Sequence, residues 1–203
     1  MLDDLRARVM KEMSPRRFRH TLAVEEMVTR LCALFCPEDT LTLRAAALLH
    51  DLTKEKSEEV QLSLCDRLGL DVSAEDRVSP KLYHARTAAA LIPVDFASFD
   101  DPIIVSAVRW HTTGREGMTL TEKLLYLADY IDESRSFDSC VLLRRYFFGA
   151  FPELMSREER EELLRQTLIM SYDMTIKDLL ADGRPVARDT VAARNELILS
   201  ART

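Results

Sequence analysis

The chain has 203 residues, of which 47% are hydrophobic, and its formal net charge is −6 at pH 7. This length can bury one sizeable core but leaves no room for a second large domain. The negative charge argues against attraction to nucleic acid or to an anionic membrane, and we expect neither as a partner. The early charged residues argue against a secretory leader, no apolar run is long enough to span a membrane, and the four cysteines form no CxxC motif. We therefore expect a cytoplasmic protein.

Apolar residues recur at helical spacing along almost the whole chain, and only five glycines are available for turns, which predicts an all-α fold. Three positions pair an N-cap residue with a proline at the first helical position and so predict helix starts: Ser14-Pro15, Ser79-Pro80 and Asp101-Pro102. The apolar segment 43–51 is expected to be helical and ends in a His-Asp pair. A further helix is expected to begin at Thr119, where Glu122 completes a capping box.

Turn-forming residues mark the less regular segments. We expect loose segments over 75–78 and around 182–185, and a short closing helix over 189–200. No internal repeat or low-complexity stretch suggests a second unit. We therefore predict a single domain over the whole chain, 1–203. It would consist of a core at about 14–135 and a C-terminal helical extension at about 136–203.

Four histidines and two aspartates form the pattern H…HD…H…H…D and are the candidate site residues: His20, His50, Asp51, His84, His111 and Asp129. Around His20, His84 and His111 apolar residues recur at helical spacing, so these imidazoles are expected to point into the core. Asp129 lies on an apolar helix, where burying an unpaired carboxylate would cost several kcal/mol. Nitrogen and oxygen donors suit a first-row transition metal, and six exceed the needs of one tetrahedral site. The set therefore predicts two metal ions.

A structural role is the alternative for these residues. A lone histidine on an apolar face is more often a hydrogen-bonded core residue than a metal ligand. Here, however, one core would have to satisfy six polar groups by hydrogen bonds alone, whereas protein cores normally hold few polar groups and pair all of them. We therefore favour a metal site.

The His50-Asp51 dipeptide and its surroundings resemble the HD superfamily of metal-dependent phosphohydrolases. Five stretches resemble more closely the YqeK family of bacterial symmetrical diadenosine tetraphosphate hydrolases, over nearly the whole chain: SPRRFRHTLAV, AALLHDLTK, HTTG, MTLTEKLLYLADYIDESR and DTVAARN. This resemblance implies an HD-domain helical bundle with a two-metal site in its core. Two stretches depart from the family pattern, Asp132-Glu133-Ser134 and Val186-Ala187-Arg188. We expect neither to contact a metal ligand, so both bear on substrate fit.

The resemblance also implies how the ligands divide between the two metals. One metal would be held by His20, His50, Asp51 and Asp129, and the other by His84, His111 and the second oxygen of Asp51. Asp51 then has a catalytic role, because it bridges metals that share the hydroxide attacking phosphorus. The implied reaction cleaves diadenosine tetraphosphate symmetrically into two ADP. The metal in this family is typically iron, although the donors suit manganese or cobalt as well.

Basic and small residues near the histidines are candidates for substrate contacts. Lys54 matches the lysine of the frequent HD-x-x-K pattern and is expected to bind a phosphate and to assist catalysis; its alternative is an exposed lysine. The remaining candidates for phosphate contact are Arg17, Thr112, Thr113, Gly114, Lys123 and Arg135. Arg17 has neighbouring arginines, so a solvated basic patch is its alternative. Trp110 is expected to pack in the core rather than to stack on an adenine.

Three other functions stay open. A one-metal HD nucleotidase would use the first ligand set but would leave His84 and His111 without a role. A cyclic-dinucleotide phosphodiesterase is less favoured, because the chain lacks the GYP signature that usually accompanies that activity. A nucleotide-sensing module would bind without turnover, and the intact ligand set argues against it. The oligomeric state is open, and a homodimer is possible.

Overall fold

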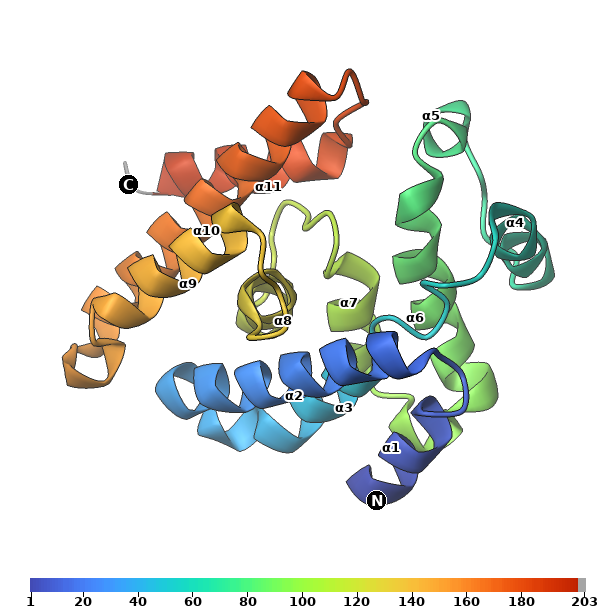
Figure 1. Ribbon diagram of the computed structural model, residues 1–203, viewed down its shortest axis with the longest axis horizontal. Coiled ribbons are helices and arrows are strands. Elements are labelled where there is room, and N and C mark those ends of the chain that lie inside the picture. The colour runs from blue at the N-terminus through green and yellow to red at the C-terminus, as the bar shows by residue number, and fades with distance from the viewer. Residues whose placement is uncertain (201–203) are drawn as a thin grey trace.

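The computed structural model describes residues 1–200. Within this range the chain forms α-helices and short 3₁₀ helices and no strand, which confirms the all-α prediction (Figure 1). The α-helices are α1 (Leu2–Val9), α2 (Pro15–Phe35), α3 (Thr40–Leu49), α4 (Glu58–Arg67), α5 (Ala74–Arg77), α6 (Tyr83–Asp95), α7 (Pro102–Trp110), α8 (Leu120–Ile131), α9 (Asp138–Gly149), α10 (Arg157–Ala181) and α11 (Arg188–Leu199). The 3₁₀ helices are η1 (Pro37–Asp39), η2 (Pro80–Leu82), η3 (Ala97–Phe99) and η4 (Pro152–Leu154).

The centre of the molecule is a bundle of α2, α3, α7 and α8, with α6 packed on α7. Helix α2 packs against α3 and α8, and α7 packs against α3, α6 and α8. Figure 1 shows α2 and α3 lying beside each other below α8 and α7. The facing surfaces are apolar and fully buried, as at Leu31, Leu48 and Leu124. Each such leucine contributes about 1.5–3 kcal/mol by leaving water, and this packing fixes the helix ends that carry the histidines.

Three of the predicted helix starts are confirmed. The Ser14 side chain accepts a hydrogen bond from the first turn of α2, and the Asp101 side chain does the same for α7. At α8, Thr119 and Glu122 form the predicted reciprocal capping box. Each of these caps satisfies amide groups that have no partner inside the helix, and losing one costs about 1 kcal/mol.

Two local predictions need correction. Ser79 makes no side-chain cap, and the proline after it begins the 3₁₀ helix η2, so α6 begins only at Tyr83. The tighter turn of η2 leaves the carbonyl of Lys81 available to the side chain of His84. The segment 75–78, expected to be loose, is largely the short helix α5, because Ser73 and Asp76 form a capping box at its start.

In the C-terminal part, α9 and α11 both pack on α10, and α10 also reaches α8 and α2. Tyr172 of α10 is fully buried, and its ring stacks on Tyr126 of α8 with the ring centroids 4.7 Å apart. The predicted closing helix is confirmed as α11, and the predicted loose segment 182–185 lies between α10 and α11. The last residues of the predicted extension, 201–203, lie outside the described residues.

Two broader expectations concern membranes and cysteines. In the part of the chain that the structure describes, no helix combines the length and the apolar character needed to cross a membrane. All four cysteines are free thiols and buried. In the interior they pack as small apolar side chains.

Candidate metal centre

The six predicted ligands come together where the ends of the central helices meet. His20 projects from α2, Asp129 from α8 and His84 from the start of α6. His50 and His111 directly follow the last residues of α3 and α7. The four imidazoles are almost completely buried, with exposed fractions between 0% and 9%. Residues from five separate helices therefore form one buried polar cluster.

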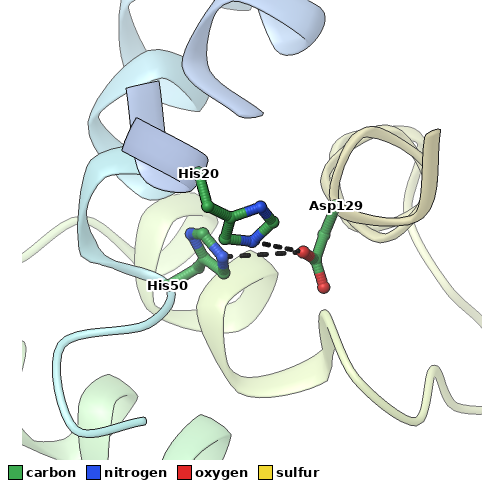
Figure 2. Close-up of side chains that lie close together, drawn as sticks. All are labelled: His20, His50 and Asp129. Carbon is green, nitrogen blue, oxygen red and sulfur yellow. Dashed lines mark ion pairs between the residues drawn. The ribbon is translucent and has the colours of Figure 1, made fainter. Parts of the chain in front are cut away.

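One side of the cluster consists of His20, His50 and Asp129, whose donor atoms lie close enough to share a metal ion. Figure 2 shows the three side chains pointing toward one another. The Asp129 carboxylate lies 3.0 Å from His20 Nε2 and 3.8 Å from His50 Nε2. These three residues and Asp51 are the set predicted for the first metal.

The other side of the cluster is formed by His50, Asp51 and His111, which also meet the distance requirement for a shared ion. The nitrogens His84 Nε2 and His111 Nε2 are 3.1 Å apart. His84 belongs to the predicted second ligand set, and its Nε2 lies 3.5 Å from Asp51 Oδ1. His50 thus lies between the two predicted sets rather than within the first alone.

Asp51 faces both sides with different oxygens. Its Oδ2 lies 3.3 Å from His50 Nε2 and 3.7 Å from His20 Nε2. Its Oδ1 lies 3.5 Å from His84 Nε2 and 3.8 Å from His111 Nε2. This is the arrangement that a carboxylate bridging two metal ions requires.

Three of the histidines are oriented by the same kind of local hydrogen bond. The Nδ1 of His50, His84 and His111 each meets the backbone carbonyl three residues earlier, at 2.6, 2.7 and 2.7 Å respectively. With Nδ1 donating, the proton is held away from the cluster and the Nε2 lone pair faces it. This is the usual second-shell arrangement for imidazoles that bind a metal.

His20 is oriented differently, by two side chains that the sequence analysis did not include among the site residues. Its Nδ1 lies 3.1 Å from Ser134 Oγ and 3.3 Å from the fully buried carboxylate of Asp132. The expectation that the departure at Asp132-Glu133-Ser134 does not contact a ligand is therefore wrong. The contact depends on the packing of α8 beside α2, which brings Asp132 at the end of α8 to the Nδ1 edge of the His20 ring. A carboxylate behind a ligating imidazole raises its basicity.

Three of the predicted phosphate-binding cations reach the cluster. Arg17 donates to Asp51 Oδ2 at 2.7 Å, and Arg135 donates to Asp129 Oδ1. Lys54 Nζ lies 3.1 Å from His84 Nε2. Burial opposes the charge on each carboxylate, but the surrounding cations and imidazoles hold the pKa of Asp51 and of Asp129 well below the usual range. Burial lowers the pKa of Lys54.

The histidines on the two sides of the cluster have opposite pKa shifts. Burial disfavours the charged form of His20, yet the carboxylates of Asp129 and Asp132 raise its pKa to about 9. Burial lowers the pKa of His111 to about 4, and it also holds the pKa of His84 well below its ordinary value. Two carboxylates thus stabilise the charged form of His20, whereas burial disfavours the charged forms of His84 and His111.

The loop after α7 carries three more predicted contacts. Thr112 Oγ1 lies 3.1 Å from Nε2 of both His84 and His111. Thr113 is buried and donates to the Gly114 carbonyl. Gly114 has a φ of +64°, and a Cβ there would collide with the Tyr172 hydroxyl, so this position requires glycine for close packing against α10.

Two remaining candidates are placed less centrally. Lys123 is half-buried, and no contact among the described residues joins it to the cluster. Trp110, which was expected to pack in the core, is also only half-buried, and the guanidinium of Arg109 lies over its ring at 4.1 Å from the centroid. The core prediction for Trp110 is therefore only partly right, because its indole binds a cation at the edge of the core.

The donor set fits metal ions. The Nε2 atoms of His20 and His50 are buried and hydrogen-bond to no residue in the range 1–200, although carboxylate oxygens lie 3.0 and 3.3 Å away. Lone pairs and carboxylate oxygens at these separations repel unless a proton or a metal ion lies between them. Donors bound to one metal at about 2.1 Å are themselves about 3–3.5 Å apart, as they are here. These residues could therefore hold metal ions.

Comparisons with known proteins agree with this geometry. The HD domain family matches residues 17–134. A symmetrical bis(5'-nucleosyl)-tetraphosphatase of Bacillus subtilis (strain 168) is 31% identical over 190 residues, covering 94% of each chain. The protein with the same description from Halalkalibacterium halodurans is 29% identical over 194 residues, again covering 94% of each chain.

A solved structure supports the same grouping at the level of the fold. The crystal structure of a protein from Clostridium acetobutylicum, described as a predicted HD superfamily hydrolase involved in NAD metabolism, superposes with a TM-score of 0.85 at 32% identity. The superposition covers 100% of this chain and 98% of that one. Together the likenesses confirm an enzyme of the hydrolase class. The chain belongs to the HD domain family.

Proposed function

We propose that this protein is a two-metal phosphohydrolase that cleaves diadenosine tetraphosphate symmetrically into two ADP. The observation that carries the proposal is the position of Asp51, whose two oxygens face separate groups of histidines. The symmetrical register of cleavage is supported by the relatives, two of which are described as symmetrical tetraphosphatases at about 30% identity.

The division of the ligands that we propose is the one that the family resemblance implies. One metal would be held by His20, His50, Asp51 and Asp129, and the second by His84, His111 and the other oxygen of Asp51. Bound there, the two metals would supply Lewis acidity toward phosphate oxygens and would lower the pKa of water, so that a nucleophile forms near neutral pH. We propose iron as the native metal, with manganese and cobalt as substitutes, because nitrogen and oxygen donors suit all three.

The cations around the centre would bind the substrate. Arg17 and Arg135 already contact the two carboxylates that face the metals, so their guanidinium groups lie where an incoming polyphosphate would meet them. Both can form bidentate bonds with phosphate oxygens. Lys54 provides a single ammonium on the His84 side, where negative charge that develops on a leaving phosphate would be neutralised. Thr112 adds a hydroxyl donor at the same place.

The experiment that tests this function identifies the products. Purified protein loaded separately with iron, manganese or cobalt is incubated with diadenosine tetraphosphate, and the nucleotides are separated by chromatography. The proposal predicts ADP as the sole product and its loss in Asp51→Ala. Equal amounts of ATP and AMP would overturn the symmetrical register. An absence of turnover in protein shown to hold two metals would overturn the substrate.

We also propose that the enzyme acts in the cytoplasm on this small-molecule substrate, without nucleic acid or membrane as a partner. The net charge of −6 supports this, because it provides no general attraction for polyanions. A homodimer stays a prediction. So does the division of the chain into a core at 14–135 and an extension at 136–203.

A further inference from the structure

Glu122, near the start of α8, is a fully buried carboxylate that belongs to neither ligand set. Its Oε2 accepts a hydrogen bond from the backbone amide of Thr119 at 2.9 Å, which completes the capping box of α8. Its Oε1 accepts further hydrogen bonds from the Ser106 hydroxyl and from two nitrogens of the Arg115 guanidinium. A capping box uses only the first of these contacts, so the start of α8 does not account for the contacts with Ser106 and Arg115.

The partners of Glu122 lie on elements that carry the metal centre. Ser106 lies on α7, whose last residue is followed by His111, and Glu122 itself lies on α8. Arg115 lies in the segment 112–119 between these two helices, which we call the 112–119 loop. One buried carboxylate thus joins α7, α8 and the loop between them.

The ion pair between Arg115 and Glu122 is suited to fixing the position of this loop. The side chain of Glu122 is 0% exposed and that of Arg115 is 30% exposed, so solvent screens the pair little. Nε and Nη2 of Arg115 both contact Glu122 Oε1, at 3.3 and 3.1 Å, which restricts the orientation of the planar guanidinium as well as its distance. Arg115 lies between Gly114 and Gly117, whose φ values are 64° and 69°. Because glycine permits many backbone conformations, this stretch depends on side-chain contacts to keep one of them.

The 112–119 loop begins with a hydroxyl that faces the metal centre. Thr112 Oγ1 lies 3.1 Å from Nε2 of His84 and 3.1 Å from Nε2 of His111. The next hydroxyl, that of Thr113, is engaged within the loop, because it donates to the Gly114 carbonyl. A misplacement of about 1 Å can cost an enzyme up to about a hundredfold in rate, so the Thr112 hydroxyl can serve a phosphate only if its backbone is held in place.

We infer that Arg115 and Glu122 are positioning residues that hold the Thr112 hydroxyl where a metal-bound phosphate accepts its hydrogen bond. Neither residue touches the substrate, and both act through Thr112 by fixing the 112–119 loop between α7 and α8. The inference rests on the proposed function, since it requires phosphate to bind on the His84 side of the centre. It extends the site beyond the residues that face the metals.

The test is a double-mutant cycle, which shows whether Arg115 acts through Thr112. The variants are Thr112→Val, which removes the hydroxyl at nearly constant volume, Arg115→Met, which removes the guanidinium, and the protein with both changes. The probe is imidodiphosphate, a pyrophosphate analogue that resists hydrolysis, and its binding to manganese-loaded protein is measured by titration calorimetry. Arg157→Met is the control, because it removes an arginine from an ion pair on α10 in which that arginine is 82% exposed.

Thr112→Val should weaken imidodiphosphate binding by about tenfold or more, because a hydrogen bond to a charged group is lost. Arg115→Met should weaken it by about three- to tenfold. The double variant should bind within about twofold of Thr112→Val, because the hydroxyl that Arg115 positions is already absent. Arg115→Lys should recover part of the affinity, since an ammonium keeps the charge without the planar fork. Bound manganese should stay at the wild-type level throughout, and Arg157→Met should leave binding unchanged.

Effects that add in the double variant would show that Arg115 acts independently of Thr112, as a purely structural ion pair does, and would overturn the inference. A loss of manganese in Arg115→Met would do the same, because the ion pair would then act on the metal ligands. Unchanged binding in Thr112→Val would overturn it as well. If thermal unfolding shows that Arg115→Met does not fold, Glu122→Gln takes its place in the cycle, because the amide has the same size and keeps one oxygen acceptor.

The binding of imidodiphosphate does not depend on the reaction, so the two proposals can fail separately. Protein that shows the coupled effects but does not cleave diadenosine tetraphosphate would retain the positioning role and overturn the proposed reaction. Protein that cleaves diadenosine tetraphosphate into ADP but shows additive effects would retain the reaction and overturn the positioning role.

Discussion

The two sides of the metal centre share Asp51 and His50 but differ in charge. On one side His20 lies between the carboxylates of Asp129 and Asp132. Arg135 pairs with both of these carboxylates, and Arg17 pairs with Asp51 Oδ2. On the other side His84 and His111 pair with the second oxygen of Asp51, and Lys54 lies against His84. Negative charges nearby stabilise a bound metal cation, and positive charges destabilise it.

The comparison indicates that the two sides differ in metal affinity and in their distance from the substrate. The side around Asp129 has the carboxylates of Asp51, Asp129 and Asp132 against the guanidinium groups of Arg17 and Arg135. Negative charge is in excess there, so we expect this side to hold its metal more tightly and to fill first. The side around His84 has imidazole donors and a competing ammonium, so we expect it to bind its metal more weakly and to lie nearer the substrate. The Asp129 side would thus anchor the centre. The His84 side, which borders a cavity of about 420 Å³ lined in part by Lys54 and Thr112, would receive the phosphates.

The largest expected effect comes from removing the residue that joins the two sides. Asp51→Asn should lower kcat/KM for diadenosine tetraphosphate by about a thousandfold or more and should reduce the bound metal to one per chain or fewer. The physical reason is that an amide supplies one weak oxygen donor in place of a bridging carboxylate. Metal content and steady-state rates measure both. Asp3→Asn, which makes the same change at a carboxylate on α1 that is 95% exposed, is the control and should leave both unchanged.

The next effect tests the anchoring side alone. Asp132→Asn should weaken the metal of that side by about ten- to a hundredfold, because His20 loses the carboxylate behind its ring. Asp132→Glu should restore part of the affinity. The metal bound by His84 and His111 should be affected little, as competition with a chelator would show. An equal weakening of both metals would mean that the two sides are not distinct.

Substitution of Lys54 is expected to have a smaller effect, which raises metal affinity and lowers turnover. Lys54→Met removes an ammonium 3.1 Å from His84 Nε2, so metal binding on that side should tighten a few-fold. Turnover should nevertheless fall by about tenfold, because the phosphate loses a cation. Arg16→Met is a basic-to-apolar control at an exposed position of α2. Looser metal binding in Lys54→Met would contradict the competition described here.

The smallest effect concerns stability against pH in protein stripped of metal by a chelator. The pKa of His20 is raised to about 9, so its contribution is fully present below pH 6.5 and is lost as the pH rises through 9. The pKa of His111 is lowered to about 4, so the unfolded chain takes up its proton first and stability falls as the pH drops from 6.5 toward 4.

Each contribution should amount to about 1–3 kcal/mol in the free energy of unfolding. Thermal unfolding between pH 4 and pH 9.5 is the measurement. His20→Gln should lose the alkaline slope and His111→Gln the acid slope. If both variants lost the pH dependence of stability in the same pH range, the electrostatic difference between the two sides would be refuted.

The sequence allowed prediction of the fold and of most of the site, because the relevant signals are local. The caps at Ser14, Asp101 and Thr119 act within one helical turn of their residues. The histidines could be recognised from their types and their order. The capping box at Ser73 and Asp76 was an equally local signal that the sequence analysis overlooked.

What the sequence did not reveal depends on contacts between elements. Asp132 reaches His20 only because α8 ends beside α2, and the spacing of the two residues along the chain gives no hint of this. The closeness of Lys54 to His84 likewise arises from the packing of α6 on α7 and the turn after α3. The cavity needs α10 and α11 to fold back over the segment 78–82, which no local pattern predicts.

The measurement that tests the central claim most directly is a crystal structure of manganese-loaded protein with anomalous scattering recorded at the metal edge. The account predicts two peaks about 3.5–4 Å apart, each bonded to a different oxygen of Asp51, with His84 and His111 on the second. A single peak bound by His20, His50 and Asp129, with Lys54 still against His84, would contradict the two-metal centre.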